Sequence, residues 1–142
     1  MENKPKATHF IITKHYGDQE PTWEADLRVL FDSGLFRCAA GQLEKGKKSG
    51  KIHLQAYLGA KTQIHGTKIT SLLPTAAFKP PKKWQNDKAN IGARMYEYCT
   101  KDDTRISEGS LVLGDPPKRV DNRQNGARGR QLQTERYATA ID

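Results

Sequence analysis

The stretch that decides the fold is LFRCAAGQLE at residues 35–44, followed by KGKKSG at 45–50 and KIHLQAYL at 51–58. The two outer runs are short and mostly apolar, and the segment between them is rich in Gly and Lys. This pattern is typical of a β-hairpin. Side chains alternate across a sheet, so His53 and Gln55 are predicted to share one face of the second strand.

Further elements are predicted on both sides of this hairpin. Apolar and aromatic residues at 9–16 indicate a strand, and Thr22 caps a predicted helix that Gly34 ends. Downstream, we expect a short helix over 62–73, a strand over 76–79, a helix over 87–101 that Asn86 or Asp87 caps, and a strand over 111–113. This order favours the α+β class, with a ferredoxin-like or RRM-like antiparallel five-stranded sheet and the helices packed on one face.

The composition indicates one domain of ordinary size. The chain has 142 residues, of which 35% are hydrophobic, enough for one core. No apolar run reaches the roughly 18 residues of a membrane span, and the first residues lack the apolar region of a signal peptide. Cys38 and Cys99 form no disulfide framework and no zinc pattern. We therefore expect an intracellular protein with reduced thiols and no membrane partner.

The net charge of +8 is concentrated in the middle of the chain. Residues 41–88 carry 10 basic and 2 acidic side chains, whereas the two charges nearly balance on either side. Such a segment suits a polyanion, because contacts with phosphates release counterions. A solvated Lys-rich loop around residues 45–51 would explain the charge equally well.

Part of this basic segment combines charge with aromatic rings. Lys79, Lys82 and Lys83 lie between Phe78 and Trp84. This composition resembles a track for a nucleic-acid single strand, in which cations follow the backbone and rings stack on bases. Trp84 would also fit a core position.

Three residues of the predicted hairpin form a candidate metal site. If the strands pair as expected, Glu44 reaches the face that carries His53 and Gln55. One carboxylate, one imidazole and one amide oxygen suit Mg²⁺ or Mn²⁺, whereas structural zinc favours thiolates. The same residues would also be ordinary on a solvated sheet face.

Tyr98 and Lys101 form a second candidate pair. They are three apart on a predicted helix and therefore neighbours. Tyrosine can act as a covalent nucleophile, and a nearby cation can stabilise charge on a phosphate. An aromatic residue on an amphipathic helix is also typical of a core. Tyr96 lies about 200° away around the helix and is expected to pack.

A nucleotide-binding loop is excluded. Residues 41–48 approach the P-loop pattern, but Lys48 stands where that pattern needs Ser or Thr. The segment also leads into a predicted strand, so no helix N-terminus would hold phosphates there.

Taken in order, these segments resemble the three motifs of replication-initiator (Rep) endonucleases of small circular single-stranded DNA viruses. The segments are Phe10–Thr13, Glu44, His53–Gln55 and Tyr98–Lys101. The circovirus-like branch of the HUH superfamily is most similar. In that branch Gln replaces the second histidine of the His-hydrophobic-His motif, and Gln55 stands at that position here. The resemblance covers about residues 8–117. The first motif departs from it, with FIITK at residues 10–14 where relatives often have FTLNN.

The resemblance implies an enzyme that nicks and rejoins a stem-loop origin in single-stranded DNA through a 5′-phosphotyrosine, initiating rolling-circle replication in the host nucleus. It implies Tyr98 as the nucleophile, Lys101 as its assistant, and Glu44, His53 and Gln55 as ligands of Mg²⁺ or Mn²⁺. We expect DNA contacts at Phe10, Thr13, Lys14, Lys51, Lys79, Lys82, Lys83 and Trp84. The alternative is a non-catalytic single-strand-binding module on the same sheet.

The resemblance also predicts the domain organisation. Residues 1–117 would form the endonuclease domain, and residues 118–142 a basic linker and the start of a truncated helix that leads to an absent helicase domain. An oligomer contact of the full-length protein would lie after residue 118.

Overall fold

A computed structural model describes residues 6–120 of this protein, apart from the side chains of residues 83–86. The elements are β1 (Lys6–His15), α1 (Trp23–Asp32), β2 (Phe36–Lys45), β3 (Ile52–His65), α2 (Thr67–Leu72), β4 (Ala77–Lys79), the 3₁₀ helix η1 (Lys82–Asn90), α3 (Ile91–Cys99) and β5 (Leu111–Gly114). No helix within residues 6–120 is long and apolar enough to cross a bilayer. The predicted helix near the C-terminus lies outside the described residues.

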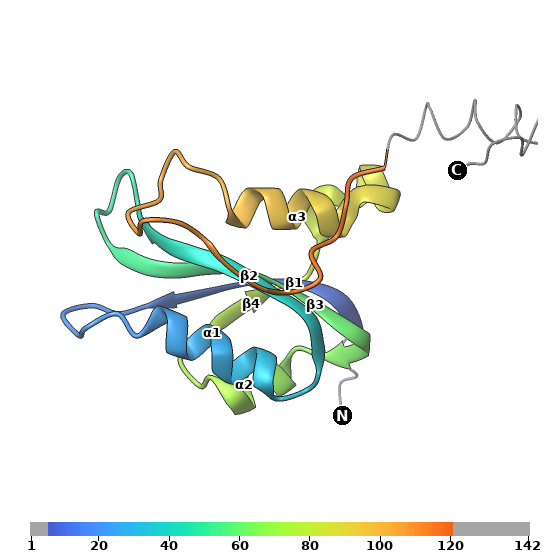
Figure 1. The fold of residues 1–142 in the computed structure, drawn as a ribbon, viewed down its shortest axis with the longest axis horizontal. Coiled ribbons are helices and arrows are strands. Elements are labelled where there is room, and N and C mark those ends of the chain that lie inside the picture. Colours follow the sequence, from blue (N-terminus) through green and yellow to red (C-terminus); the bar gives the residue numbers. More distant parts are fainter. Residues whose placement is uncertain (1–5, 121–142) are drawn as a thin grey trace, which may run out of the picture.

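One antiparallel sheet organises the fold, with strand order β4-β1-β3-β2-β5 (Figure 1). This confirms the predicted α+β class and its five-stranded sheet. The hairpin register pairs Glu44 with His53, and β1 pairs Thr13 with Gln55. The central strand β3 therefore aligns the candidate site residues of both of its neighbours.

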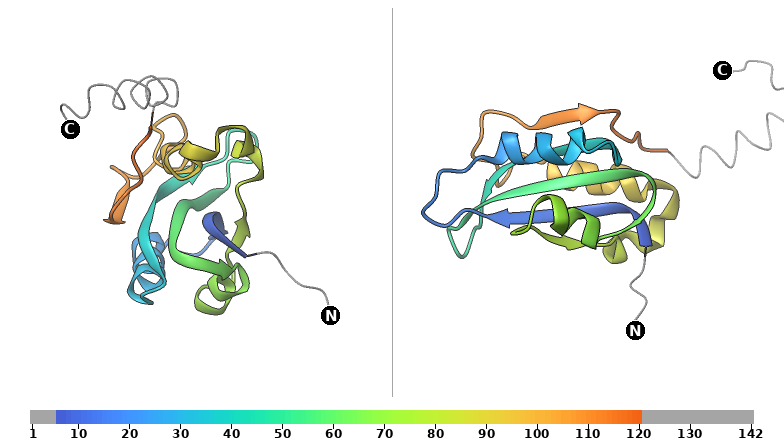
Figure 2. Two further views of the ribbon diagram at one scale, coloured as in Figure 1. Left: turned by 90° about the vertical axis from the view of Figure 1, so that its right-hand side faces the viewer. Right: turned by 90° about the horizontal axis from the view of Figure 1, so that it is seen from below.

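The helices cover both faces of the sheet. Helices α1 and α2 lie on one face and α3 lies on the other, as the views in Figures 1 and 2 agree. The prediction that all helices pack on one face is therefore wrong. The amphipathic pattern of a helix marks its own buried side and does not identify the sheet face that it meets.

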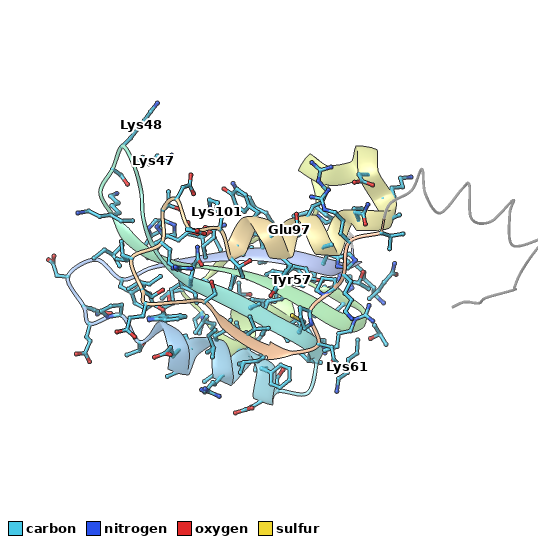
Figure 3. All side chains as sticks on the ribbon, turned by 45° about the horizontal axis from the view of Figure 1, so that its top comes forward. Lys47, Lys48, Tyr57, Lys61, Glu97 and Lys101 are labelled. Carbon is cyan, nitrogen blue, oxygen red and sulfur yellow. The ribbon has the colours of Figure 1, made fainter. Side chains whose placement is uncertain are left out.

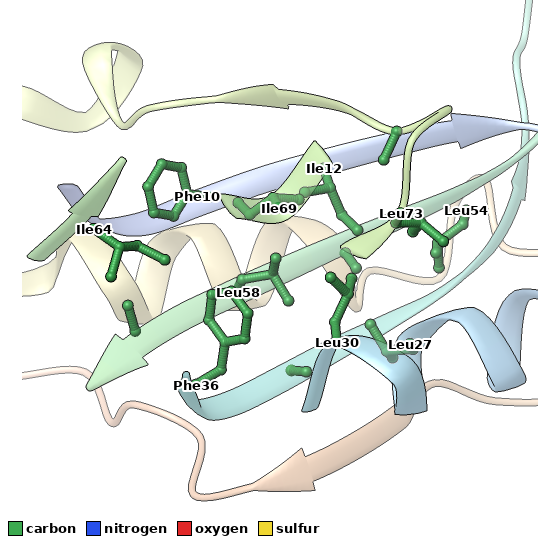
Figure 4. Packing of buried hydrophobic residues seen from close by; sticks show 14 of the residues in the cluster. Phe10, Ile12, Leu27, Leu30, Phe36, Leu54, Leu58, Ile64, Ile69 and Leu73 are labelled. Carbon is green, nitrogen blue, oxygen red and sulfur yellow. The ribbon is translucent and has the colours of Figure 1, made fainter. Parts of the chain in front are cut away.

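The larger core lies between the sheet and helices α1 and α2 (Figure 4). Leu58 of β3 is fully buried near its centre, together with Leu27 and Leu30 of α1 and Ile69 of α2. Phe10 and Ile12 extend this core along β1. Burial of these side chains supplies the main stabilising free energy of the domain.

A smaller core lies beneath α3. Met95 and Cys99 pack on Tyr57 of the sheet, and Tyr96 meets the Tyr57 ring edge-on at 6.5 Å, consistent with the packing role expected for it. Gly92 permits this close approach, because a Cβ atom there would lie 2.8 Å from the ring of His9 and 3.0 Å from the Tyr57 hydroxyl. Beyond Cys99, this face of the sheet carries polar side chains.

Two predicted boundaries are wrong. The helix expected from Thr62 begins only at Thr67, because β3 continues to His65 and pairs there with the start of β1. The helix expected over 87–101 is a 3₁₀ helix up to Asn90 and an α-helix only over Ile91–Cys99. Local periodicity does not reveal how far a strand finds a pairing partner.

Leu58→Ala should lower the free energy of unfolding by about 2–5 kcal/mol, because it leaves a cavity in the larger core. Urea unfolding at neutral pH measures the change. Val29→Ala on α1 is the control, because Val29 is 48% exposed and should change stability by less than about 0.5 kcal/mol. Equal losses in the two variants would contradict the assigned core.

Candidate active site

Polar side chains from three strands lie together on the sheet face that α3 partly covers. Side chains alternate along each strand, so pairing in register places every second residue of neighbouring strands on one face. The polar residues on this face are Thr13 and His15 of β1, Gln42 and Glu44 of β2, and His53 and Gln55 of β3. The register thus brings together the three predicted metal ligands.

Glu44 is the central charge of the site. It is 4% exposed, and its carboxylate accepts hydrogen bonds from Gln42 Nε2 at 2.9 Å and from Lys101 Nζ at 3.2 and 3.4 Å. His53 Nε2 lies 3.7 Å from Glu44 Oε1. Burial raises the pKa of Glu44, but the contacts with His53, Gln42 and Lys101 outweigh it and hold that pKa below its usual value. Glu44 is therefore an anion at neutral pH.

Lys101 joins this carboxylate to Tyr98. Helix α3 ends at Cys99, so Lys101 lies just beyond it and turns back toward the sheet (Figure 3). Its Nζ donates to the Tyr98 carbonyl at 3.1 Å and lies 4.1 Å from the centroid of the Tyr98 ring. One ammonium group thus contacts both the proposed nucleophile and the proposed metal ligand.

A groove of about 550 Å³ adjoins this group. It is lined by Ile11, Thr13, Gln55, Lys79, Pro80, Lys82 and Tyr98. Pairing of β1 with β4 places Lys79 opposite Ile11, and the Thr13 hydroxyl donates to Gln55 Oε1 at 3.2 Å. This one groove is therefore lined by five residues that were predicted separately as metal ligand, nucleophile or DNA contact.

Other predicted DNA contacts lie elsewhere. Phe10 is buried in the larger core on the opposite face, against Phe78. Lys14 also faces that side and pairs with Asp26 at 2.9 Å. Neither side chain reaches the groove. Lys51 is exposed in the β2–β3 turn, and the side chains of Lys83 and Trp84 lie outside the described part of the structure.

Gln42 is a supporting residue that the sequence analysis missed. Its buried side chain donates to Glu44 and to the backbone carbonyl of Lys101, and its Oε1 accepts a hydrogen bond from the Ser110 hydroxyl at 2.5 Å. One amide thus fixes the carboxylate to two points of the loop after α3. Its position two residues before Glu44, on the same strand face, was a usable signal.

His15 is the second residue that was missed. It lies opposite His53 in the β1–β3 register, with ring centroids 5.2 Å apart. Burial and the nearby charges of His53 and Lys51 lower the pKa of His15. The sequence did not predict this pair. The pairing register of two strands that are far apart in the chain cannot be deduced from the sequence of either strand alone.

The donor atoms fit a hard divalent cation. Within residues 6–120, no group of three His, Cys, Asp or Glu side chains is placed to hold a metal, so the third donor would be the amide oxygen of Gln55. His53 Nδ1 lies 3.2 Å from the Lys51 carbonyl. A proton on Nδ1 would be held there and would leave the Nε2 lone pair directed at the Glu44 side, as in many metal-binding histidines.

No protein-family model matches this sequence, and no curated protein matches it. Support for a function therefore comes from the geometry of the site and from the order of the motifs. In the structure, Lys101 contacts Glu44, so two motifs that are more than 40 residues apart in the sequence lie next to each other.

Glu44→Gln should reduce the fall in the free energy of unfolding that the protein shows as the pH is lowered. Because the pKa of Glu44 is lower in the folded than in the unfolded state, the ionised carboxylate stabilises the fold at neutral pH. That stabilisation is lost as the pH falls below about 4.3, the usual pKa of Glu, and through the folded value. Urea unfolding from neutral to acid pH should show a smaller fall for the variant than for wild type.

The control for this titration is Glu20→Gln, which removes one exposed carboxylate. It should follow the wild-type pH profile. A Glu44→Gln profile that also follows wild type would contradict the assigned contacts.

Proposed function

We propose that this chain is a metal-dependent endonuclease and strand-transferase of single-stranded DNA, with Tyr98 as its nucleophile. The observation that carries the proposal is the position of Lys101, whose ammonium contacts Glu44 at 3.2 Å and lies 4.1 Å from the Tyr98 ring. The groove beside Tyr98 also has Lys79 and Lys82 in its lining, which suits a phosphate backbone.

The proposed reaction exchanges one phosphodiester for another. The Tyr98 oxygen attacks the phosphorus, the bond to the 3′ oxygen breaks, the phenol gives up its proton and the 3′ oxygen gains one. Lys101 would stabilise the charge that develops on the phosphate. Mg²⁺ or Mn²⁺ held by Glu44, His53 and Gln55 would polarise the non-bridging oxygens. The 3′ hydroxyl can later attack the phosphotyrosine and rejoin the strand.

The motif resemblance extends the proposal to a biological role. The substrate would be the loop of a stem-loop origin, and the free 3′ hydroxyl would prime rolling-circle replication in the host nucleus. The runner-up is a non-catalytic single-strand-binding module, which the groove and its lysines support without assigning chemistry to Tyr98.

Tyr98→Phe should abolish a covalent protein–DNA adduct that the wild type forms with Mn²⁺. The probe is a single-stranded pool of random sequence, which requires no knowledge of the origin. Because Tyr98 would keep the 5′ phosphate of the downstream fragment, a 3′ label should remain on the protein in a denaturing gel and a 5′ label should leave it. Chelation of the metal should also abolish the adduct.

Tyr96→Phe is the matched control and should still form the adduct, because Tyr96 packs on Tyr57. Binding of the pool without any adduct would favour the binding module. Cleavage that persists in Tyr98→Phe, with no adduct in either protein, would indicate a hydrolase that uses water.

Lys101→Met should lower the rate of adduct formation by about 10²–10³-fold, because it removes a cation from the reacting phosphate. Single-turnover gel assays at saturating DNA measure this rate. Lys61→Met, which removes an exposed lysine at the far end of β3, should leave the rate unchanged. An unchanged rate in Lys101→Met would exclude the proposed role.

A further inference from the structure

A second hollow, of about 410 Å³, lies outside the groove that Tyr98 lines. It is formed by the β2–β3 turn and the loop after α3, and its lining residues run over 45–50 and 103–106. Neither segment is part of the proposed chemistry.

Backbone hydrogen bonds hold this hollow in shape. The Gly46 N–H donates to the Lys51 carbonyl at 3.0 Å, and the Gly50 N–H donates to the Gly46 carbonyl at 2.8 Å, which closes the turn. The Lys45 N–H donates to the Thr104 carbonyl at 3.1 Å, and a bridge pairs Glu44 with Arg105. The loop is thus attached to the edge of β2 beside the turn.

The rim of the hollow is strongly basic. Its charged side chains are Lys45, Lys47, Lys48 and Arg105 against the single carboxylate Asp103. Asp103 lies 3.3 Å from Lys47, and both side chains are well exposed, so this ion pair is weak. The Gly46 and Gly50 N–H groups are engaged in the turn, so they do not form a phosphate-binding loop of the nucleotide type. A polyanion bound by side chains suits this surface better.

The hollow lies on the opposite side of the site from the groove. The groove uses β4, β1 and β3, whereas the hollow uses the end of β2 and the turn, and the Glu44–His53 pair lies between them in strand order. Lys47 follows Glu44 by three residues, about 10 Å along an extended chain. Figure 3 shows Lys47 and Lys48 at the hairpin tip, beyond Lys101, with Lys61 at the other end of the molecule.

We propose that this hollow binds backbone phosphates of the cleaved single strand, on the side of the nick opposite the groove. The inference rests on the proposed function, since it needs a strand that crosses the Glu44–His53 pair. Such a strand leaves the groove past Tyr98 and meets the lysines of the turn within a few nucleotides. The contacts are electrostatic and independent of base sequence.

The test is the salt dependence of DNA binding in the double variant K47Q/K48Q. If each lysine contacts one phosphate, the slope of log K against log salt should shrink by about 1.4. Between 50 and 200 mM salt, the affinity of the parent protein should then fall about sevenfold more than that of the variant. Fluorescence anisotropy with labelled oligothymidylate measures both, in the Tyr98→Phe background so that cleavage does not interfere.

K61Q/K68Q is the matched control, because it removes two exposed lysines and lowers the net charge equally. Its slope should equal that of the parent, and K47R/K48R should also retain the parent slope. Equal slopes in the two glutamine variants, no binding of oligothymidylate by the parent, or a change seen only with a stem-loop would overturn the inference. These measurements need no adduct, so they are read separately from the test of Tyr98.

Discussion

The buried carboxylate of Glu44 is the constraint on which the rest of the site depends. A buried charge is costly unless it is paired and hydrogen-bonded, and Glu44 meets that cost with Gln42, His53 and Lys101. The three partners come from the same strand, the next strand and the loop after α3. Satisfying one anion therefore fixes the loop that follows Tyr98 and holds these three segments together.

The helices cover the two sheet faces unequally, and the fully covered face makes the strands that carry the site rigid. Helices α1 and α2 seal one face with a continuous apolar core, whereas α3 covers only part of the other. The polar side chains therefore project from strands whose reverse side is locked by packing. Sites on such elements hold their geometry better than sites on loops.

The hairpin was predictable because both of its strands and its turn are contiguous, and two-residue alternation then places His53 and Gln55 beside Glu44. Alternation along β1 would also have separated Phe10 from Thr13, which lie three residues apart and face opposite sides. The contacts of Lys101 with Glu44 and of His15 with His53 join distant segments. Such contacts depend on tertiary packing and strand register, which local patterns do not contain.

The glycine at position 92, in the first turn of α3, has a consequence for how closely this helix packs on the sheet. Because Gly92 has no side chain, there is room beside it for His9 and for the Tyr57 hydroxyl. His9 Nδ1 and this hydroxyl are hydrogen-bonded to each other at 2.9 Å. A Cβ atom at this position would lie 2.8 Å from the His9 ring and 3.0 Å from the Tyr57 hydroxyl, so either this pair or the helix would have to shift. The close approach of α3 to the strands, which also positions Tyr98 near the other end of the helix, therefore depends on a glycine at position 92.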